Sequence, residues 1–320
     1  MDQYTTETQR WLDERFQLAT DDGVFYAHQN IYGFQARRLR TTVQGKPSGY
    51  ADPTAVVRYV IFWNIVKALK TLQFDSILDV GGAEGYMSGA FKAFFGARVR
   101  TSDLSREACK RAEEIFGIET DTVDGVALPY PDGTFDVVLC SEALEHIPDY
   151  QEVLRELLRV ARRSVIITVP HDGPEAVARN IREKVPHGHI HDFTLDSFKD
   201  LVPHPYRVEA VGLSSSLLKL PFRLIDGVDL DPATRPGIKA PFVWLLNRII
   251  PLCRWFMNEA AFKFFIKLDS FLANRLRTYR GVLFIISKDS SAFSNEPHHP
   301  NVNMDTVLNF KVPLYYMAGK

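Results

Sequence analysis

One stretch constrains the fold more than any other, residues 76–85, which read SILDVGGAEG. Residues 77–80 are apolar apart from Asp79 and predict a short buried strand at 76–80, and helical spacing resumes at Tyr86. A strand, a glycine turn and a helix form the opening of a nucleotide-binding βαβ unit. Glycine has no Cβ to hold a ligand away from the backbone, and the helix directs its first N–H groups at the turn. The stretch therefore predicts a nucleotide-like ligand at the end of this strand.

The spacing of the small residues bears on which nucleotide binds. A dinucleotide site needs the pattern G-x-G-x-x-G/A, and counting from Gly81 gives Gly81, Ala83 and then Tyr86. The missing third small residue argues against NAD. Asp103 ends the next apolar stretch, 103 − 79 = 24 residues after Asp79. An acid at that distance is placed to accept hydrogen bonds from ribose hydroxyls.

Two further motifs follow in order. Residues 124–129 read DGVALP, and residues 135–147 read FDVVLCSEALEHI. With the glycine turn and its strand-end acid, this set resembles the class I S-adenosylmethionine-dependent methyltransferases over roughly Phe74 to Phe198. The resemblance is specific for fold and cofactor and says little about the substrate. Ala83 stands where the family usually has glycine, so we expect a slightly tighter turn with cofactor binding retained.

The resemblance implies roles for individual residues. Asp79 would order the glycine loop and the methionine amino group, Asp103 would bind the ribose, and Asp124 would bind the adenine amino group. The alternative for each is an ordinary turn-capping or exposed acid. The full cofactor-binding set expected for S-adenosylmethionine is Asp79, Gly81, Gly82, Ala83, Gly85, Asp103, Leu104, Asp124, Gly125, Val126, Ser141 and Glu142.

Catalysis of methyl transfer needs alignment, and it needs a general base only when the acceptor carries a proton to lose. The candidates are His146, which the resemblance places near the methyl donor, His171 and His189. A histidine that merely packs and fixes its loop is the alternative for His146. His187, His189 and His191 alternate and would share one face of an extended segment, which could hold a metal. We expect polar lining there and predict no metal site.

Apolar strands and helical stretches alternate from Phe74 onward. Strands are predicted at 76–80, 97–102, 119–123, 135–140, 164–169, 206–213 and 281–287, and helices at 85–95, 105–116, 149–162 and 195–201. The pattern predicts an α/β fold with a doubly wound, mostly parallel seven-stranded sheet, whose ligands bind at the carboxyl ends of the strands. The last two strands, a hairpin in the family, are separated by 280 − 213 = 67 residues, which is too long for a simple loop.

Four segments are predicted. Residues 1–73 form a helical lid or cap, 74–213 the cofactor-binding core, 214–280 a helical insertion, and 281–320 the last strand and a tail. In the first segment we predict helices at Tyr4–Ala19 and Pro53–Leu72, the second forming a lid or packing on the sheet. The aromatic and amide residues of 26–32 are expected to face the active site.

The insertion is basic as well as apolar. Residues 217–280 contain eleven Lys and Arg against five Asp and Glu, a charge of 11 − 5 = +6. Its apolar runs are interrupted by basic residues and prolines, which suits short helices with one apolar and one basic face. Such helices could cap an acceptor pocket, or they could contact an anionic membrane surface or a lipid-linked substrate.

Composition narrows the classes of protein that remain possible. The net charge of −1 gives no sign of a nucleic-acid partner, and three distant cysteines suggest no disulfide framework. The polar first residues do not form a signal peptide and no apolar run is long enough to span a membrane, so we expect a cytoplasmic protein, at most peripheral to the membrane. We predict an S-adenosylmethionine-dependent methyltransferase acting on a small-molecule, glycan or lipid-linked acceptor. The alternatives are a catalytically silent cofactor-binding protein and, less favoured, an NAD-dependent oxidoreductase.

Overall fold

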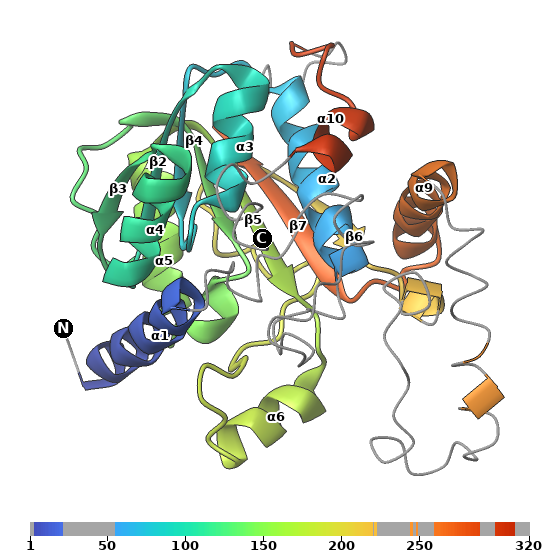
Figure 1. Ribbon diagram of the computed structural model, residues 1–320, viewed down its shortest axis with the longest axis horizontal. Coiled ribbons are helices and arrows are strands. Elements are labelled where there is room, and N and C mark those ends of the chain that lie inside the picture. Colours follow the sequence, from blue (N-terminus) through green and yellow to red (C-terminus); the bar gives the residue numbers. More distant parts are fainter. Residues whose placement is uncertain are drawn as a thin grey trace.

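The computed structural model describes residues 3–21, 55–219, 221–222, 244–245, 248, 259–288 and 298–310 (Figure 1). The expectation for residues 26–32 and most of that for the insertion fall outside these ranges. Within them, the seven predicted strands form one sheet in the order β3-β2-β1-β4-β5-β7-β6. The strands are β1 Ser76–Val80, β2 Arg98–Asp103, β3 Glu119–Thr122, β4 Phe135–Ser141, β5 Ala161–Pro170, β6 Arg207–Leu213 and β7 Gly281–Ser287.

The sheet is parallel except at one end. β7 lies between β5 and β6 and runs antiparallel to both. The chain order reverses direction between β1 and β4, which pair in parallel, and that is where ligands bind in open α/β sheets. The predicted α/β fold is confirmed, and the candidate residues at strand ends are thereby gathered along one edge of the sheet.

The described α-helices follow most of the predicted ranges. They are α1 Gln3–Asp21, α2 Ala55–Thr71, α3 Tyr86–Phe95, α4 Arg106–Phe116, α5 Tyr150–Val160, α6 Pro174–Arg182, α9 Glu259–Arg275 and α10 Met304–Asn309. The helix predicted at 195–201 is wrong, because that stretch forms consecutive turns closed by short-range bonds such as Ser197 N–H to the Thr194 carbonyl. Helix α6 was not predicted.

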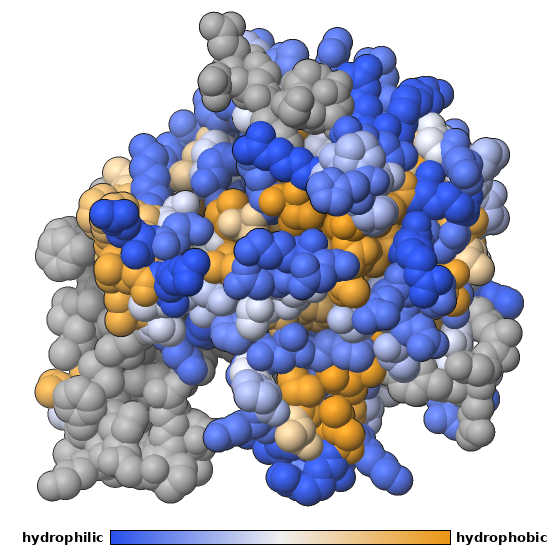
Figure 2. Space-filling view, turned by 180° about the vertical axis from the view of Figure 1, so that it is seen from behind, coloured by the Kyte–Doolittle hydropathy of each residue, from blue (hydrophilic) through white to orange (hydrophobic). Residues whose placement is uncertain are grey.

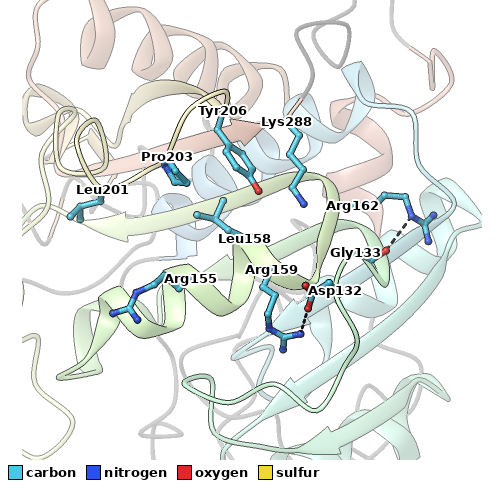
Figure 3. A pocket seen from close by; sticks show the side chains of 10 residues that line it. All are labelled: Asp132, Gly133, Arg155, Leu158, Arg159, Arg162, Leu201, Pro203, Tyr206 and Lys288. Carbon is cyan, nitrogen blue, oxygen red and sulfur yellow. Dashed lines mark hydrogen bonds and ion pairs between the residues drawn. The ribbon is translucent and has the colours of Figure 1, made fainter.

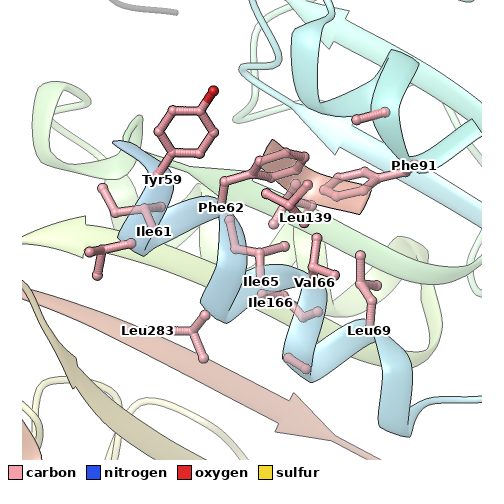
Figure 4. Close-up of a cluster of buried hydrophobic side chains, with 14 of the residues drawn as sticks. Tyr59, Ile61, Phe62, Ile65, Val66, Leu69, Phe91, Leu139, Ile166 and Leu283 are labelled. Atoms are coloured by element: carbon pink, nitrogen blue, oxygen red, sulfur yellow. The ribbon is translucent and has the colours of Figure 1, made fainter. Parts of the chain in front are cut away.

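One face of the sheet is covered by a large apolar cluster built around α2. Phe62, Ile65 and Leu69 are buried against Phe91 of α3 and against side chains of the central strands (Figure 4). Because α2 is apolar over most of its circumference, burial on several sides stabilises it more than an exposed position would. Of the two alternatives for this helix, packing on the sheet is the one observed.

The opposite face is covered by α5 and by the segment that follows α6. Phe193 and Phe198 are buried there, and the ring of Phe198 lies 4.5 Å from that of Phe284 in β7. This anchoring holds the histidine-containing residues 187–191, which immediately precede Phe193, beside the carboxyl ends of β4 and β5.

The C-terminal strands are tied to the described part of the insertion. Asp269 of α9 accepts hydrogen bonds from the backbone N–H groups of Ser214 and Ser215, just after β6, at 3.0 and 2.7 Å. Further along the chain, α10 returns to pack on α2, with Val307 and Leu308 buried in the same cluster. The part of the tail that is described therefore folds back onto the core.

Candidate active site

The glycine turn after β1 is crowded in a way that only small residues satisfy. Gly81 has φ of 73°, and a Cβ built there would lie 2.9 Å from the Cβ of Ala143. Gly85 has φ of 76° and would place a Cβ 2.8 Å from the Cβ of Ala112. Ala83 itself adopts φ of 48°. The absent side chains leave a cradle of bare backbone at the end of β1, as the sequence predicted.

Asp79 is buried beneath this turn. Its Oδ2 accepts a hydrogen bond of 2.7 Å from the hydroxyl of Ser88 in α3, and the Ser88 hydroxyl in turn accepts one of 2.5 Å from Thr101. Burial raises the pKa of Asp79 to about 7, against which the Ser88 hydrogen bond acts only in part. A buried carboxylate at the switch point is suited to receive a positively charged ligand group, which would compensate its lost hydration.

Asp103 makes backbone hydrogen bonds with both carboxylate oxygens. Oδ2 accepts from the N–H of Ala83 and Oδ1 from the N–H of Ser105, each at 2.9 Å. Burial raises the pKa of Asp103 to about 6 in spite of these bonds. The acid predicted to bind ribose therefore also fixes the glycine turn against β2.

A second acid in the turn has a role that the motif did not reveal. Glu84 is fully buried and pairs with Arg111 of α4, whose Nε and guanidinium NH2 groups each lie 2.8 Å from the carboxylate. The pair joins the start of α3 to the middle of α4. The two residues are 27 positions apart and nothing in their spacing signals the contact.

Helix α1 lies over the ends of β2 and β3. Asp13 accepts hydrogen bonds from the Ser105 hydroxyl at 2.6 Å and the Glu107 N–H at 3.2 Å, and Thr5 donates to Asp124 at 3.3 Å. The other predicted adenine-side residues, Leu104, Gly125 and Val126, are partly buried along the same edge. The structure thus brings the predicted ribose and adenine contacts together and adds α1 above them.

The end of β4 is held by Thr168 of β5. The Ser141 and Thr168 hydroxyls are 2.7 Å apart, and the Glu142 N–H donates to the Thr168 carbonyl at 2.8 Å. Glu142 has φ of 55°, an uncommon value for a residue with a side chain, so the chain turns sharply there. Burial raises the pKa of the Glu142 carboxyl. The sharp turn carries the chain from β4 into the 3₁₀ turn Leu144–His146.

The predicted histidines lie beyond this turn, and they do not share one face. His187 stacks on His146 with ring centres 3.7 Å apart, and His189 lies edge-on to His146 at 4.8 Å. His191 instead directs its Nε2 at the carbonyl of Ile147, 2.9 Å away. The segment 187–191 is not a strand, so the alternation in the sequence does not place the three rings together.

Two of the histidines are backed by carboxylates. His171, directly after β5, has its Nδ1 2.9 Å from an oxygen of Asp192, and the Nδ1 of His189 contacts Asp172. The hydrogen bond from His189 lowers the pKa of Asp172. A carboxylate at Nδ1 fixes the tautomer that leaves Nε2 able to accept a proton. Neither Asp172 nor Asp192 was singled out from the sequence, because their partners are known only once the loops are folded.

A surface depression elsewhere on the molecule has a different character. It measures about 520 Å³ and lies where β4 and β5 begin, at the opposite edge of the sheet (Figure 3). Its guanidinium groups are already engaged: Arg159 with Asp132 and Glu156, and Arg162 with Asp136 and the Gly133 carbonyl. These guanidinium groups thus hold α5 and the start of β5 against the loop that leads into β4.

Comparisons with known proteins agree with this geometry. Residues 78–169 match the family described as "Methyltransferase domain". The chain is 27% identical over 192 residues to methyltransferase GfsG of Streptomyces halstedii, covering 58% of this chain and 66% of that protein. It is 35% identical over 101 residues to norajmaline N-methyltransferase of Rauvolfia serpentina, covering 29% and 35%. The alignments thus span less than two thirds of these relatives.

Solved structures extend the likeness in fold to most of the chain. The geranyl diphosphate C-methyltransferase of Streptomyces coelicolor, solved with Mg²⁺, geranyl diphosphate and S-adenosyl-L-homocysteine, matches with a TM-score of 0.50 at 16% identity, covering 90% of this chain and 98% of that one. A geranyl diphosphate methyltransferase solved with geranyl diphosphate and sinefungin gives 0.52 at 14%, covering 90% and 100%. At such identities the likeness concerns the fold.

The residues present fit S-adenosylmethionine as the cofactor. The turn at Gly81 packs so closely against Ala143 that no side chain fits there, so bare backbone lies at the end of β1 with the buried carboxylate of Asp79 beneath it. Asp103 and Asp124 stand at the ends of the next strands, in the order that the motifs predicted. Residues 78–169 therefore match a methyltransferase domain, and the resemblance to the class I S-adenosylmethionine-dependent methyltransferases rests on that part of the chain.

Proposed function

We propose that this protein is an enzyme that methylates a hydroxyl group of a small, largely apolar acceptor. The observation that carries the proposal is that a cofactor-type site and a group of possible general bases lie next to each other on one edge of the sheet. A glycine cradle with buried acids lies at the ends of β1 and β2, and carboxylate-backed imidazoles lie just beyond β4 and β5. When bound, S-adenosylmethionine supplies an activated methyl group, so the protein must align the acceptor and remove its proton.

We assign the proton transfer to His171 rather than to His146 or His189. Asp192 accepts from Nδ1 of His171, so the lone pair is at Nε2, which has no hydrogen-bond partner among the described residues. The Nε2 atoms of His146 and His189 instead face the carboxylate of Glu145, at 3.6 and 4.0 Å. An imidazole whose accepting nitrogen is open to the acceptor is the better base.

The acceptor class is supported by the relatives and by the surface. The curated relatives include a 2-methyl-6-phytyl-1,4-hydroquinone methyltransferase and a tocopherol O-methyltransferase, whose names specify a phytyl hydroquinone and tocopherol. They share only part of their length with this chain, so the names indicate a class and no particular compound. An apolar acceptor with one reacting hydroxyl suits a site where the cofactor already carries the reactivity.

Helix α9 offers a surface by which such an acceptor could be reached. Phe264 and Phe271 are each 60% exposed, and at helical spacing they share one stripe of α9 with exposed Lys267 and Arg275. Hydrophobic and hydrophilic side chains lie side by side at this edge of the molecule (Figure 2, left edge). No helix in the described ranges is long and apolar enough to cross a bilayer. We propose that this face rests on an anionic membrane, where each basic residue contributes about 1 kcal/mol.

The test combines turnover with lipid binding. The full chain is incubated with methyl-labelled S-adenosylmethionine and a total lipid extract, and we expect label in the organic phase. Label that remains in the aqueous phase despite tight cofactor binding would favour a catalytically silent binding protein. Tighter binding of NAD than of S-adenosylmethionine in calorimetry would instead favour the oxidoreductase alternative.

Membrane contact is measured separately. Co-sedimentation with vesicles should require anionic lipid and should weaken as salt is added, since the attraction is screened. The variant Phe264→Ser with Phe271→Ser should remain in the supernatant while keeping its cofactor affinity. Sedimentation equal to that of the unaltered chain would remove α9 from this role.

A further inference from the structure

Three potential metal ligands converge just beyond β4. The Oε1 atom of Glu145 lies 3.6 Å from Nε2 of His146 and 4.0 Å from Nε2 of His189. The three ligand atoms lie within 4.8 Å of one another. Glu145 and His146 belong to the 3₁₀ turn, and His189 comes from a loop 43 residues beyond His146 (189 − 146 = 43), so the fold itself makes the cluster.

Both imidazoles are oriented by an acceptor at Nδ1, the nitrogen that faces away from Glu145. Nδ1 of His189 contacts the carboxylate of Asp172, and Nδ1 of His146 lies 3.3 Å from the backbone carbonyl of Gly188. A neutral ring that donates at Nδ1 presents the lone pair of Nε2, and in both residues this nitrogen is the one turned toward Glu145. Metal-bound histidines are held in this manner, by a carboxylate or a backbone carbonyl at the other nitrogen.

The burial of Glu145 supports a cation site independently of the distances between the ligand atoms. Its side chain is 1% exposed, and its Oε2 atom has no hydrogen-bond partner within the described part of the chain. The N–H of Ile190 donates 2.8 Å to the backbone carbonyl of Glu145, so the loop carrying His189 is fixed to the same residue. A buried carboxylate oxygen that lacks a donor is costly unless a proton or a cation compensates it.

The surrounding charges favour a cation. Glu142 and Asp172 act on Glu145 with the same sign of charge, whereas Arg58 provides the positive charge that opposes them. Three carboxylates thus repel one another here, with Arg58 opposing them at Glu145 and Arg280 at Asp172. A divalent ion between Glu145 and the two imidazoles would bring the cluster near neutrality.

We propose that Glu145, His146 and His189 form a binding site for a divalent transition-metal ion of the zinc type. Two imidazoles and one carboxylate are a familiar donor set for Zn²⁺, whereas Mg²⁺ and Ca²⁺ prefer oxygen donors alone. Tetrahedral Zn²⁺ needs its ligand atoms about 3.3 Å apart, so the longest separation in the cluster must shrink by about 1.5 Å. Three protein ligands leave a position open for water or an acceptor oxygen.

The experiment measures metal binding without any methyl transfer, so its result is independent of the proposed function. The full chain is freed of metal with a chelator and titrated with Zn²⁺ in competition with a chromogenic chelator. Co²⁺ serves as a second probe, because its visible absorption reports nitrogen and oxygen ligation. We expect one equivalent of Zn²⁺ to bind, and Glu145→Gln and His189→Ala to weaken it by at least about 100-fold. Asp172→Asn should weaken it by about 10- to 100-fold.

The control removes an imidazole far from the cluster. His298 is exposed, and His298→Ala should bind Zn²⁺ as the unaltered chain does. Glu145→Gln keeps the size of the side chain, and its thermal melt shows whether the fold is intact. Absence of Zn²⁺ binding at micromolar concentration, or unchanged affinity in both Glu145→Gln and His189→Ala, would overturn the proposal and leave the cluster as a hydrogen-bonded polar lining.

Discussion

The ends of β1 and β2 differ from the ends of β4 and β5 in how their polar groups are assembled. At β1 and β2, Asp79 reaches Ser88 nine residues on, and Asp103 reaches Ala83 twenty residues back. These contacts belong to one βαβ unit. Beyond β4 and β5, the partners come from separate loops, as in the pairs of His171 with Asp192 and of Glu145 with His189. Local contacts leave a sequence motif, whereas contacts between loops leave none.

The largest effect is expected from filling the cradle of the β1 end. Gly81→Val should reduce cofactor binding below detection, because a β-branched residue would be forced to φ of 73° and would collide with Ala143. Calorimetry with S-adenosylmethionine measures this. The matched control is Gly96→Val, since Gly96 has φ of 65° and open space around its Cβ position. That variant should lose stability but keep the cofactor, and similar losses of binding in both would assign the effect to backbone strain alone.

Substitutions at the end of β5 should lower the rate of methyl transfer and leave cofactor affinity unchanged. His171→Ala should lower turnover by about 10²- to 10⁴-fold and leave cofactor affinity unchanged, because the imidazole is proposed to act on the acceptor. Asp192→Asn should give a smaller loss and should alter the pH profile, since it removes the negative charge beside Nδ1 of His171 while leaving the imidazole in place. Near-normal turnover of His171→Ala would remove this residue from the base role.

A smaller loss of cofactor affinity is expected at Asp103, because this residue both holds the glycine turn and is predicted to bind the cofactor. Asp103→Ala should weaken cofactor binding by about 1.5–3 kcal/mol, the scale of hydrogen bonds lost to a charged group. The same change should lower the melting temperature, because the N–H groups of Ala83 and Ser105 lose their acceptor. Asp103→Asn keeps one acceptor oxygen and should lose less of both. Unchanged affinity in the alanine variant would show that Asp103 serves the turn alone.

The smallest effect concerns pH. The folded-state pKa of Asp79 is raised from 3.8 to about 7, so without cofactor the folded chain holds an extra proton across that window and its stability falls as pH rises through it. A cationic ligand group needs the carboxylate, so affinity should rise about tenfold from pH 6 to pH 8. Asp79→Asn should flatten this dependence. A flat profile for the unaltered chain would place the positive group elsewhere.

The fold and the cofactor residues could be predicted because both rest on local patterns. Glycines at fixed distances from a strand, and an acid at the end of the next, follow from backbone geometry that one βαβ unit imposes. The prediction that His187, His189 and His191 share one face was wrong, because alternation places side chains on one face only in an extended strand and this segment is a loop. The pairing of Glu84 with Arg111 depends on how α3 and α4 pack, which spacing does not encode. Asp172 and Asp192 were likewise found only through the folded loops.

The position of β7 between β5 and β6 has a consequence for biosynthesis. β5 is complete at residue 170, yet its outer edge pairs only with β7, which starts at residue 281. The ribosome must add 280 − 170 = 110 residues in between, which takes about 6–22 s at 5–20 residues per second. During this time the apolar residues of β5 present an unpaired strand edge. A nascent chain halted in this interval is therefore the form most exposed to aggregation and most in need of a chaperone.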